Sequence, residues 1–288
     1  MRRSAWRFSR NIDAGMTVRV TLPALQQMKH DGRKIVAVVA YDYQMAQIVD
    51  RAGVDLVSVG DSVGVNVWGR ASELDVTLDE MILVCRAVRC GVTRALVSCD
   101  MPYGPLQESP EAAARAAVRL VTEGGADLVK LDGAAEHPDG VTAVTREGIP
   151  VWAQFGVTPQ TAARAGRPAL PPSELVAAMK DQLVREAQFL EEAGASLLDF
   201  THSGSVAGPP VVRAVRIPVL GGLGGGPWLD GRVRAVFPAI GYLASAIDDQ
   251  AERYANVAET TLAAIRAFGD DVRAGRQIRG GAPAARTA

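Results

Sequence analysis

The sequence predicts an α/β protein, specifically a (β/α)8 barrel of the TIM type. Short apolar runs alternate with helical patterns along the 288 residues, a length that is typical of such a barrel. Several of these runs end in an aspartate, at the position where parallel-strand proteins bind their ligands. No Gly-x-Gly-x-x-Gly motif opens the first unit, which disfavours the doubly wound alternative.

Eight runs are predicted as strands, because they are short, apolar and bounded by turn residues. In chain order they are Ile35–Ala40, Asp55–Gly60, Ala95–Asp100, Asp127–Asp132, Ile149–Gln154, Ser196–Thr201, Ile217–Gly221 and Val236–Tyr242. The strand pattern is least regular in the last run.

Helices are predicted between the strands, and several begin with a recognisable cap. Ser109 precedes a proline and Ser173 precedes an acid, two arrangements that start helices. The predicted helices are Tyr43–Ala52, Leu78–Cys90, Pro110–Glu123, Gly140–Arg146, Ser173–Ala193 and Val206–Val215.

One barrel domain is predicted, with a segment added at each end. Residues 1–21 form an N-terminal extension that leads into a short helix at Leu22–Lys29. Residues 22–275 form the barrel domain, which ends in a long C-terminal helix at Gln250–Ala274. Residues 276–288 are rich in glycine and alanine and are expected to be disordered.

Composition excludes several classes of function. The formal net charge is −1 and no basic stripe is interleaved with aromatic residues, so nucleic acid is not an expected partner. No apolar run has the length of a membrane span, and the basic N-terminus lacks the apolar core of a signal peptide. The three cysteines show no metal-binding spacing. We therefore expect a cytoplasmic protein that acts on a small molecule.

Three aspartates indicate where that molecule binds. Asp61, Asp100 and Asp132 each close a predicted strand in successive units. One such aspartate could be a helix cap, but three at the same edge are typical of a site for a hard cation such as Mg²⁺.

Five motifs that surround these aspartates occur in a fixed order. They are Ala40-Tyr41-Asp42-Tyr43, Val59-Gly60-Asp61-Ser62-Val63-Gly64, Asp100-Met101-Pro102-Tyr103, Val129-Lys130-Leu131-Asp132-Gly133 and Gly156-Val157-Thr158-Pro159-Gln160. Together they resemble the ketopantoate hydroxymethyltransferase family of the phosphoenolpyruvate mutase/isocitrate lyase superfamily. The resemblance runs from about Leu22 to Phe268.

The resemblance implies a Mg²⁺-dependent barrel that transfers a hydroxymethyl group from 5,10-methylenetetrahydrofolate to a 2-oxo acid, 3-methyl-2-oxobutanoate. It also implies a homo-oligomer. The metal ligands map onto Asp61 and Asp100, and the acidic position after the fourth strand, usually Glu, is Asp132 here. The positions near the oxo acid map onto Tyr41, Ser62 and Lys130.

The chemistry of these residues agrees with that reaction. A 2-oxo acid chelates Mg²⁺ through its carboxylate and keto oxygens, and the cation stabilises the enolate. Lys130 would add a second positive charge at the same oxygen. Strand alternation places Lys130 and Asp132 on one face, so both can reach one site.

The residues that would handle the proton depart from the family. Thr201 stands where the family has the glutamate that removes the C3 proton, and a threonine hydroxyl cannot accept that proton unaided. Two nearby groups could replace it: Asp199, one layer deeper on the same face, and His202, in the following loop. Gln154 stands where the family has a histidine, so it can bind substrate but cannot carry a proton.

Three hypotheses follow. The first is hydroxymethyl transfer to a 2-oxo acid or a related acceptor, with a rebuilt acid/base group. The second is a lyase or hydrolase that breaks a C–C or C–P bond in a 2-oxo or 2-hydroxy acid, since such a reaction needs no base at Thr201. The third is a non-catalytic relative that only binds a ligand, against which the joint presence of Asp61, Ser62, Asp100 and Lys130 argues.

Overall fold

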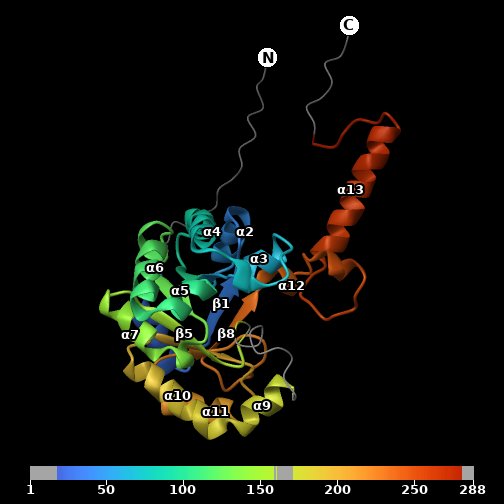
Figure 1. Ribbon diagram of the computed structural model, residues 1–288. Helices are drawn as coiled ribbons and strands as arrows, with labels where there is room; N and C mark the ends of the chain where they lie inside the picture. The colour runs from blue at the N-terminus through green and yellow to red at the C-terminus, as the bar shows by residue number, and fades with distance from the viewer. Residues whose placement is uncertain (1–17, 159, 161–170, 281–288) are drawn as a thin grey trace.

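Eight parallel strands curl into a nearly closed barrel with its helices on the outside (Figure 1). The structure is a computed structural model that describes residues 18–158, 160 and 171–280. The strand order is β7-β6-β5-β4-β3-β2-β1-β8. Its two ends meet, because Val219 and Gly221 accept backbone hydrogen bonds from Asp230 and Val233 at 2.9 and 3.2 Å. The predicted fold class is confirmed.

Seven of the eight strands lie where the sequence predicts them. The strands are β1 (Ile35–Val39), β2 (Leu56–Val59), β3 (Leu96–Asp100), β4 (Leu128–Leu131), β5 (Val151–Gly156), β6 (Leu197–Thr201), β7 (Val219–Leu220) and β8 (Gly231–Ala235).

The eighth predicted strand, Val236–Tyr242, was wrong. Its first four residues form the short helix α12 (Val236–Ala239), and the true β8 lies just before it. Pro238 has no backbone N–H to donate to a sheet, which disfavours a strand there. β8 itself is hidden from pattern analysis because two exposed residues, Arg232 and Arg234, flank Val233, which is buried in the barrel.

Helices follow the strands in the order expected for strand–helix units, and most of them surround the barrel. They are α1 (Leu22–His30), α2 (Tyr43–Arg51), α3 (Val63–Asn66), α4 (Leu78–Gly91), α5 (Tyr103–Glu108), α6 (Pro110–Thr122), α7 (Pro138–Arg146), α9 (Pro172–Ala178), α10 (Lys180–Glu192), α11 (Gly208–Ala214) and α13 (Val257–Arg273). In the described part of the chain, the 3-10 turns are η1 (Glu73–Asp75), η2 (Ala134–Glu136) and η3 (Ala244–Ile247). The predicted helix Ser173–Ala193 is two helices, since Met179 separates α9 from α10.

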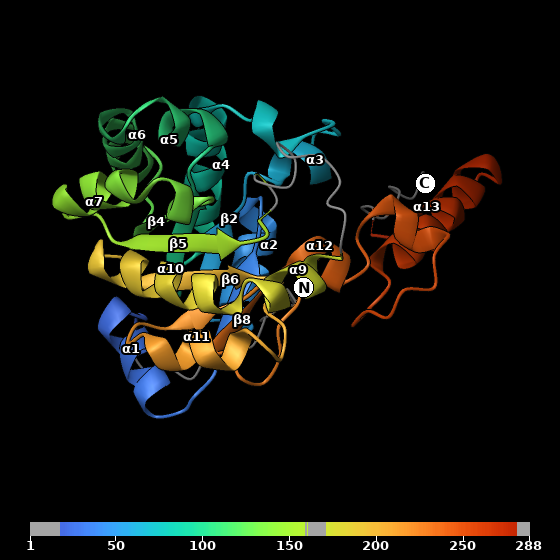
Figure 2. The same cartoon turned by 60° about the horizontal axis from the view of Figure 1, so that its bottom comes forward.

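The barrel interior is apolar at the amino-terminal ends of the strands and polar towards their carboxyl ends. α1 closes the amino-terminal end, as the blue helix at the base of Figure 2 shows. Its residues Leu25 and Met28 pack with a layer of inward side chains. That layer consists of Ile35, Leu56, Leu96, Leu128, Trp152, Leu197, Leu220 and Val233. Because strand side chains alternate, the next inward positions carry Lys130, Gln154 and Asp199 towards the carboxyl end of the barrel.

Within the described part of the chain, no helix combines the length and the apolar character that crossing a bilayer requires.

A salt bridge fixes the loop that runs from β2 to α4. Arg70 pairs with both carboxylate oxygens of Glu80 and also donates to the backbone oxygen of Asp75 at 2.8 Å. Glu80 belongs to a capping box, since its carboxylate accepts from the Thr77 backbone N–H at 2.9 Å. The hydrogen bonds from Arg70 and then from Thr77 lower the pKa of Glu80 to about 2.

Replacing Glu80 by Gln should lower the thermal unfolding midpoint by about 2–4 °C near neutral pH. Because the folded-state pKa lies below the ordinary value of 4.5, the carboxylate stabilises the fold fully above about pH 5 and less as the pH falls towards 2. Calorimetry of both proteins across this range measures the difference. Glu111→Gln, in the first turn of α6, is the control for loss of an acid near a helix start. A difference that does not change with pH would contradict the prediction.

Candidate active site

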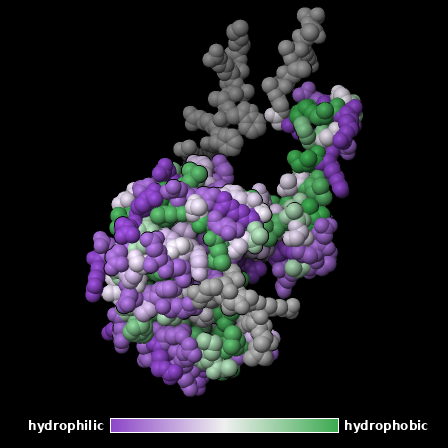
Figure 3. Space-filling model, viewed as in Figure 1, coloured by the Kyte–Doolittle hydropathy of each residue, from purple (hydrophilic) through white to green (hydrophobic). Residues whose placement is uncertain are grey.

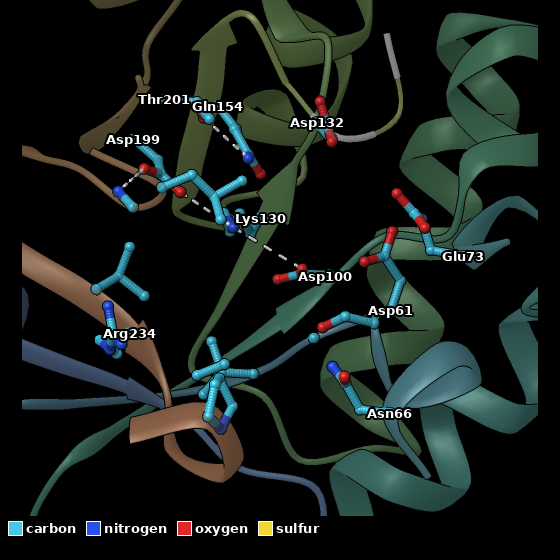
Figure 4. A pocket seen from close by; sticks show the side chains of 18 of the residues that line it. Asp61, Asn66, Glu73, Asp100, Lys130, Asp132, Gln154, Asp199, Thr201 and Arg234 are labelled. Atoms are coloured by element: carbon cyan, nitrogen blue, oxygen red, sulfur yellow. Dashed lines mark hydrogen bonds and ion pairs between the residues drawn. The ribbon is translucent and has the colours of Figure 1, made fainter. Parts of the chain in front are cut away.

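A cavity of about 460 Å³ opens at the carboxyl ends of the strands. Figure 4 shows acidic side chains on one side of it and Lys130 near its centre. The residues that line it and that matter below are Val39, Asp61, Ser62, Val65, Asn66, Glu73, Asp100, Lys130, Asp132, Gln154, Asp199, Thr201, Gly222, Leu223, Arg234 and Pro238.

The three predicted aspartates all line this cavity. Asp61 follows β2, Asp100 is the last residue of β3, and Asp132 follows β4. Burial raises the pKa of Asp61 to about 8, with the charge of Asp100 adding to the effect and a hydrogen bond from Gln160 opposing it. Burial likewise raises the pKa of Asp132 to about 6. Both shifts mean that ionising these carboxyl groups is unfavourable here unless a cation offsets the negative charge.

Gln160 ties the β5 loop to two of these carboxylates. Its side-chain nitrogen donates to Asp61 Oδ2 at 2.7 Å, and its backbone N–H donates to Asp132 Oδ2 at 3.2 Å. The other oxygen, Asp132 Oδ1, is buried without a hydrogen-bond partner among the described residues. Such an atom calls for a cation or a water that it can bind.

The donor set fits Mg²⁺ as a partly protein-bound ion. Within the described residues, no three acidic, histidine or cysteine side chains lie close enough together to hold a metal ion by themselves. Mg²⁺ is commonly held by one or two carboxylates, with the remaining ligands supplied by water and substrate oxygens. Asp61 and Asp100 would be those carboxylates, and Asp132 would accept from a metal-bound water.

Lys130 lies between two carboxylates inside the barrel. Its ammonium nitrogen is 3.1 Å from Asp199 Oδ2 and 3.8 Å from Asp100 Oδ2. It also lies 5.2 Å from the centre of the Trp152 ring, beneath the site. Burial alone would lower the pKa of Lys130, but the charges of Asp100 and Asp199 outweigh it and raise that pKa. Lys130 is therefore a protonated, fixed cation at neutral pH.

A short hydrogen-bond chain orients Ser62. The Ser62 hydroxyl lies 3.0 Å from the Tyr41 hydroxyl, which accepts from the Asn66 side-chain nitrogen at 2.9 Å. Tyr41 is buried and does not line the cavity, whereas Ser62 and Asn66 do. Burial raises the pKa of Tyr41, so its hydroxyl stays protonated and can donate to Ser62. Of Tyr41 and Ser62, which were both predicted near the oxo acid, only Ser62 lines the cavity, and Tyr41 contacts the Ser62 hydroxyl from behind it.

The residues on β5 and β6 form a neutral pair beside a charged one. Gln154 donates from its side-chain nitrogen to the Thr201 hydroxyl at 3.1 Å, and both residues are buried. Asp199 is engaged twice, because Oδ2 pairs with Lys130 and Oδ1 accepts from the Gly222 backbone N–H at 3.3 Å. Its geometry is that of a group that holds Lys130 in place.

His202 is not brought together with the other predicted residues. It is half-buried, and it is absent from the described residues that line the cavity. Its backbone has φ of 57°, a left-handed conformation that is uncommon for histidine. Burial lowers the pKa of His202, so the ring is neutral at pH 7. Its catalytic role stays a prediction.

Pattern analysis missed three of the residues that line the cavity. Asn66 and Glu73 lie in the irregular stretch between β2 and α4, and Arg234 lies on the unrecognised β8. Asn66 and Glu73 could have been found from their position, because they lie in a polar loop that follows Asp61, one of the predicted metal ligands. Nothing in the pattern of the sequence pointed to Arg234.

Solved structures with this architecture agree with the fold. Phosphonopyruvate hydrolase in complex with oxalate and Mg²⁺ matches with a TM-score of 0.55 at 15% identity, over 93% of this chain and 92% of that one. A 2,3-dimethylmalate lyase, a member of the phosphoenolpyruvate mutase/isocitrate lyase superfamily, matches with a TM-score of 0.57 at 16% identity, over 92% and 90%. These likenesses and the strand order place the chain in the class of (β/α)8 barrels.

Sequence comparison identifies the family within it. Residues 19–277 match the family model of ketopantoate hydroxymethyltransferase. A 3-methyl-2-oxobutanoate hydroxymethyltransferase of Cyanothece is 39% identical over 256 residues, which cover 88% of this chain and 96% of that one. Another, of Pyrococcus furiosus, is 38% identical over 259 residues, which cover 89% of each. The chain belongs to the ketopantoate hydroxymethyltransferase family, a family of transferases, as the motifs predicted.

Replacing Asp61 by Asn should weaken Mg²⁺ binding at least about tenfold. Because the pKa of Asp61 is raised to about 8, the free carboxyl is mostly protonated at pH 7, and Mg²⁺ must displace that proton. Affinity should therefore rise between pH 6 and 8 in the original protein, and Asp61→Asn should remove most of that rise. Titration calorimetry in buffers of different ionisation enthalpy measures both the affinity and the proton release.

Asp42→Asn is the matched control for this experiment. Asp42 also follows a strand, but its carboxylate caps α2 by accepting from the Met45 backbone N–H at 2.8 Å. The Asp42→Asn variant should bind Mg²⁺ as tightly as the original protein does. Equal loss of affinity in both variants would show that the cation lies elsewhere.

Proposed function

We propose that the protein transfers a hydroxymethyl group from 5,10-methylenetetrahydrofolate to a 2-oxo acid with the help of Mg²⁺. One observation carries this proposal: Asp61, Asp100 and Lys130 converge on a single cavity. They do so in a chain that is 38–39% identical, over most of its length, to proteins named 3-methyl-2-oxobutanoate hydroxymethyltransferase. The sequence identity supports hydroxymethyl transfer as the reaction, and the residues of the cavity support activation of a 2-oxo acid by Mg²⁺ and Lys130.

Asp61 and Asp100 would hold the cation, which when bound stabilises the negative charge of an enolate oxygen. Lys130 would donate a charge-assisted hydrogen bond to the same oxygen. The Ser62 hydroxyl, oriented by Tyr41 and Asn66, donates to the carboxylate of the oxo acid. These groups are fixed before substrate arrives, so little reorganisation is needed as charge develops.

The far wall of the cavity would hold the remainder of the acceptor. Gln154 and Thr201 present amide and hydroxyl groups there, which can hydrogen-bond a substrate but cannot accept its C3 proton at neutral pH. Asp199 is the carboxylate next to them, and its contact with Lys130 favours a positioning role over that of a free base. We therefore infer an acceptor that loses this proton more readily than 3-methyl-2-oxobutanoate does, so that solvent water in the open cavity accepts it.

The neutral Gln154–Thr201 pair also favours a second candidate. A lyase or hydrolase that acts on a C–C or C–P bond of a 2-oxo or 2-hydroxy acid starts from an alcohol or a hydrated ketone. Such a reaction requires no carboxylate at Thr201. It would use the same cation site and the same Lys130 to stabilise the enolate that leaves.

A panel of 2-oxo acids with Mg²⁺ and 5,10-methylenetetrahydrofolate tests the proposal. We expect Mg²⁺-dependent exchange of the C3 proton with solvent deuterium, followed by hydroxymethyl transfer, for at least one acid. Lys130→Ala should lower both rates about a hundredfold or more, while Lys180→Ala, exposed on α10, should not. Nuclear magnetic resonance follows both reactions. Release of pyruvate or glyoxylate from 2-hydroxy acids, without transfer, would favour the lyase instead.

The C-terminal helix supports a further part of the proposal, that the protein assembles with copies of itself. α13 projects away from the barrel and contacts η3 at its base (Figure 1). Figure 3 shows apolar residues exposed along this projection. Ile265, Phe268 and Val272 are 62%, 51% and 52% exposed, and their spacing places them on one face of the helix. An unpartnered apolar stripe of this kind fits a second subunit.

Replacing Ile265 and Phe268 together by Asp should convert the protein to a smaller species, because charges in an apolar interface are not paired. Light scattering after size-exclusion chromatography measures the mass. Arg266→Glu lies on the opposite face of α13 and should leave the mass unchanged. An original protein of monomeric mass would refute the assembly.

A further inference from the structure

We propose that Glu73 and Arg234 form the subsite for the one-carbon donor, at the mouth of the cavity. The inference rests on the proposed function, since it takes the donor to be a reduced folate. Glu73 would accept the paired N–H groups of the pteridine ring, and Arg234 would bind the glutamate tail. The acceptor would occupy the deeper part of the cavity between Asp61, Asp100 and Lys130.

Glu73 is the carboxylate in the cavity that the site leaves uncommitted. Asp61 and Asp132 bind Gln160, while Asp100 and Asp199 flank Lys130. The Glu73 side chain has no hydrogen-bond or ion-pair partner among the described residues. A carboxylate that lines a cavity without a partner is available to a ligand.

The segment that carries Glu73 is held firmly. The Ser72 hydroxyl accepts from the Leu74 backbone N–H at 3.1 Å, and Arg70 donates to the Asp75 backbone oxygen at 2.8 Å. Val76, directly after the turn, is buried in the core. The carboxylate of Glu73 is therefore presented by a fixed turn, so that binding costs little conformational entropy.

Arg234 lies across the cavity from Glu73, as Figure 4 shows. It is exposed on β8 and has no ion-pair partner among the described residues. Apolar side chains line the same cavity, namely Val65, Leu223 and Pro238. The mouth of the cavity thus offers the hydrogen-bond-accepting carboxylate of Glu73, an apolar surface and the positively charged guanidinium of Arg234.

A reduced folate carries matching groups in one molecule. Its pteridine presents an N–H and an amino group side by side, which a carboxylate accepts as two parallel hydrogen bonds. Its ring and aminobenzoyl portions need apolar surface, and its glutamate carboxylates suit a guanidinium. A donor held in this way would point its methylene group into the cavity, towards the acceptor.

Binding of two probes to the full-length protein with Mg²⁺ tests the subsite. The probes are tetrahydrofolate and 6-methyltetrahydropterin, which lacks the aminobenzoyl-glutamate tail. Glu73→Gln should weaken both about tenfold, because both share the ring. Arg234→Gln should weaken tetrahydrofolate about threefold and leave the pterin unchanged. Calorimetry or fluorescence measures the affinities without relying on turnover.

Two neighbouring substitutions serve as controls. Asp75→Asn removes a carboxylate from the same turn that does not line the cavity. Arg216→Gln removes an exposed guanidinium before the amino end of β7. Neither should change the affinity for either probe. C3 proton exchange in a 2-oxo acid without donor should be normal in Glu73→Gln, since the acceptor site is intact.

The outcomes separate the subsite from the reaction. If the original protein transfers hydroxymethyl groups but Glu73→Gln binds both probes equally well, the subsite is refuted and the reaction stands. Loss of donor-free exchange in Glu73→Gln would also refute the subsite, because it would place Glu73 at the acceptor. If both probes bind as expected and no transfer occurs, the subsite stands and the reaction fails.

Discussion

The buried ammonium of Lys130 is the group on which the rest of the site depends. Charges inside a barrel are costly unless neighbours of opposite sign compensate them. Asp199 supplies that compensation from β6 at 3.1 Å and Asp100 supplies part of it from β3 at 3.8 Å. This arrangement crosses the barrel, so it links the position of Asp100 to that of Asp199 on the other wall of the cavity.

The layers of the barrel explain why such a charge is tolerated there. Below Lys130 lies an apolar floor that includes Trp152, whose ring faces the ammonium group. Above it the cavity opens towards solvent and the acidic residues. Asp199 is itself fixed by the Gly222 backbone N–H, which requires that β6 and the turn after β7 keep their register. A change in that turn, which itself lines the cavity, would therefore also reach Lys130 through Asp199.

Much of this could be predicted from the sequence, because it depends on local pattern. Apolar runs gave seven strands, and the acids that close three of them line one cavity. β8 could not be read in the same way, since its charged residues alternate with a single buried valine. The pairing of Asp199 with Lys130 joins residues 69 positions apart, a contact that only the closed barrel creates. That the Glu73 side chain has no hydrogen-bond or ion-pair partner among the described residues likewise depends on the folded surroundings, so the sequence could not predict it.

The contact between Gln154 and Thr201 has a consequence for how this family can diversify. The pair lies on β5 and β6, while Asp61, Asp100 and Asp132 lie at the carboxyl ends of β2, β3 and β4. Each side chain of the pair uses the other as a partner, so neither relies on the acids. Substitutions at Gln154 and Thr201 can therefore occur without disturbing the contacts of Asp61, Asp100 and Asp132. One wall of the barrel can in this way change, strand by strand, while the opposite wall keeps its arrangement.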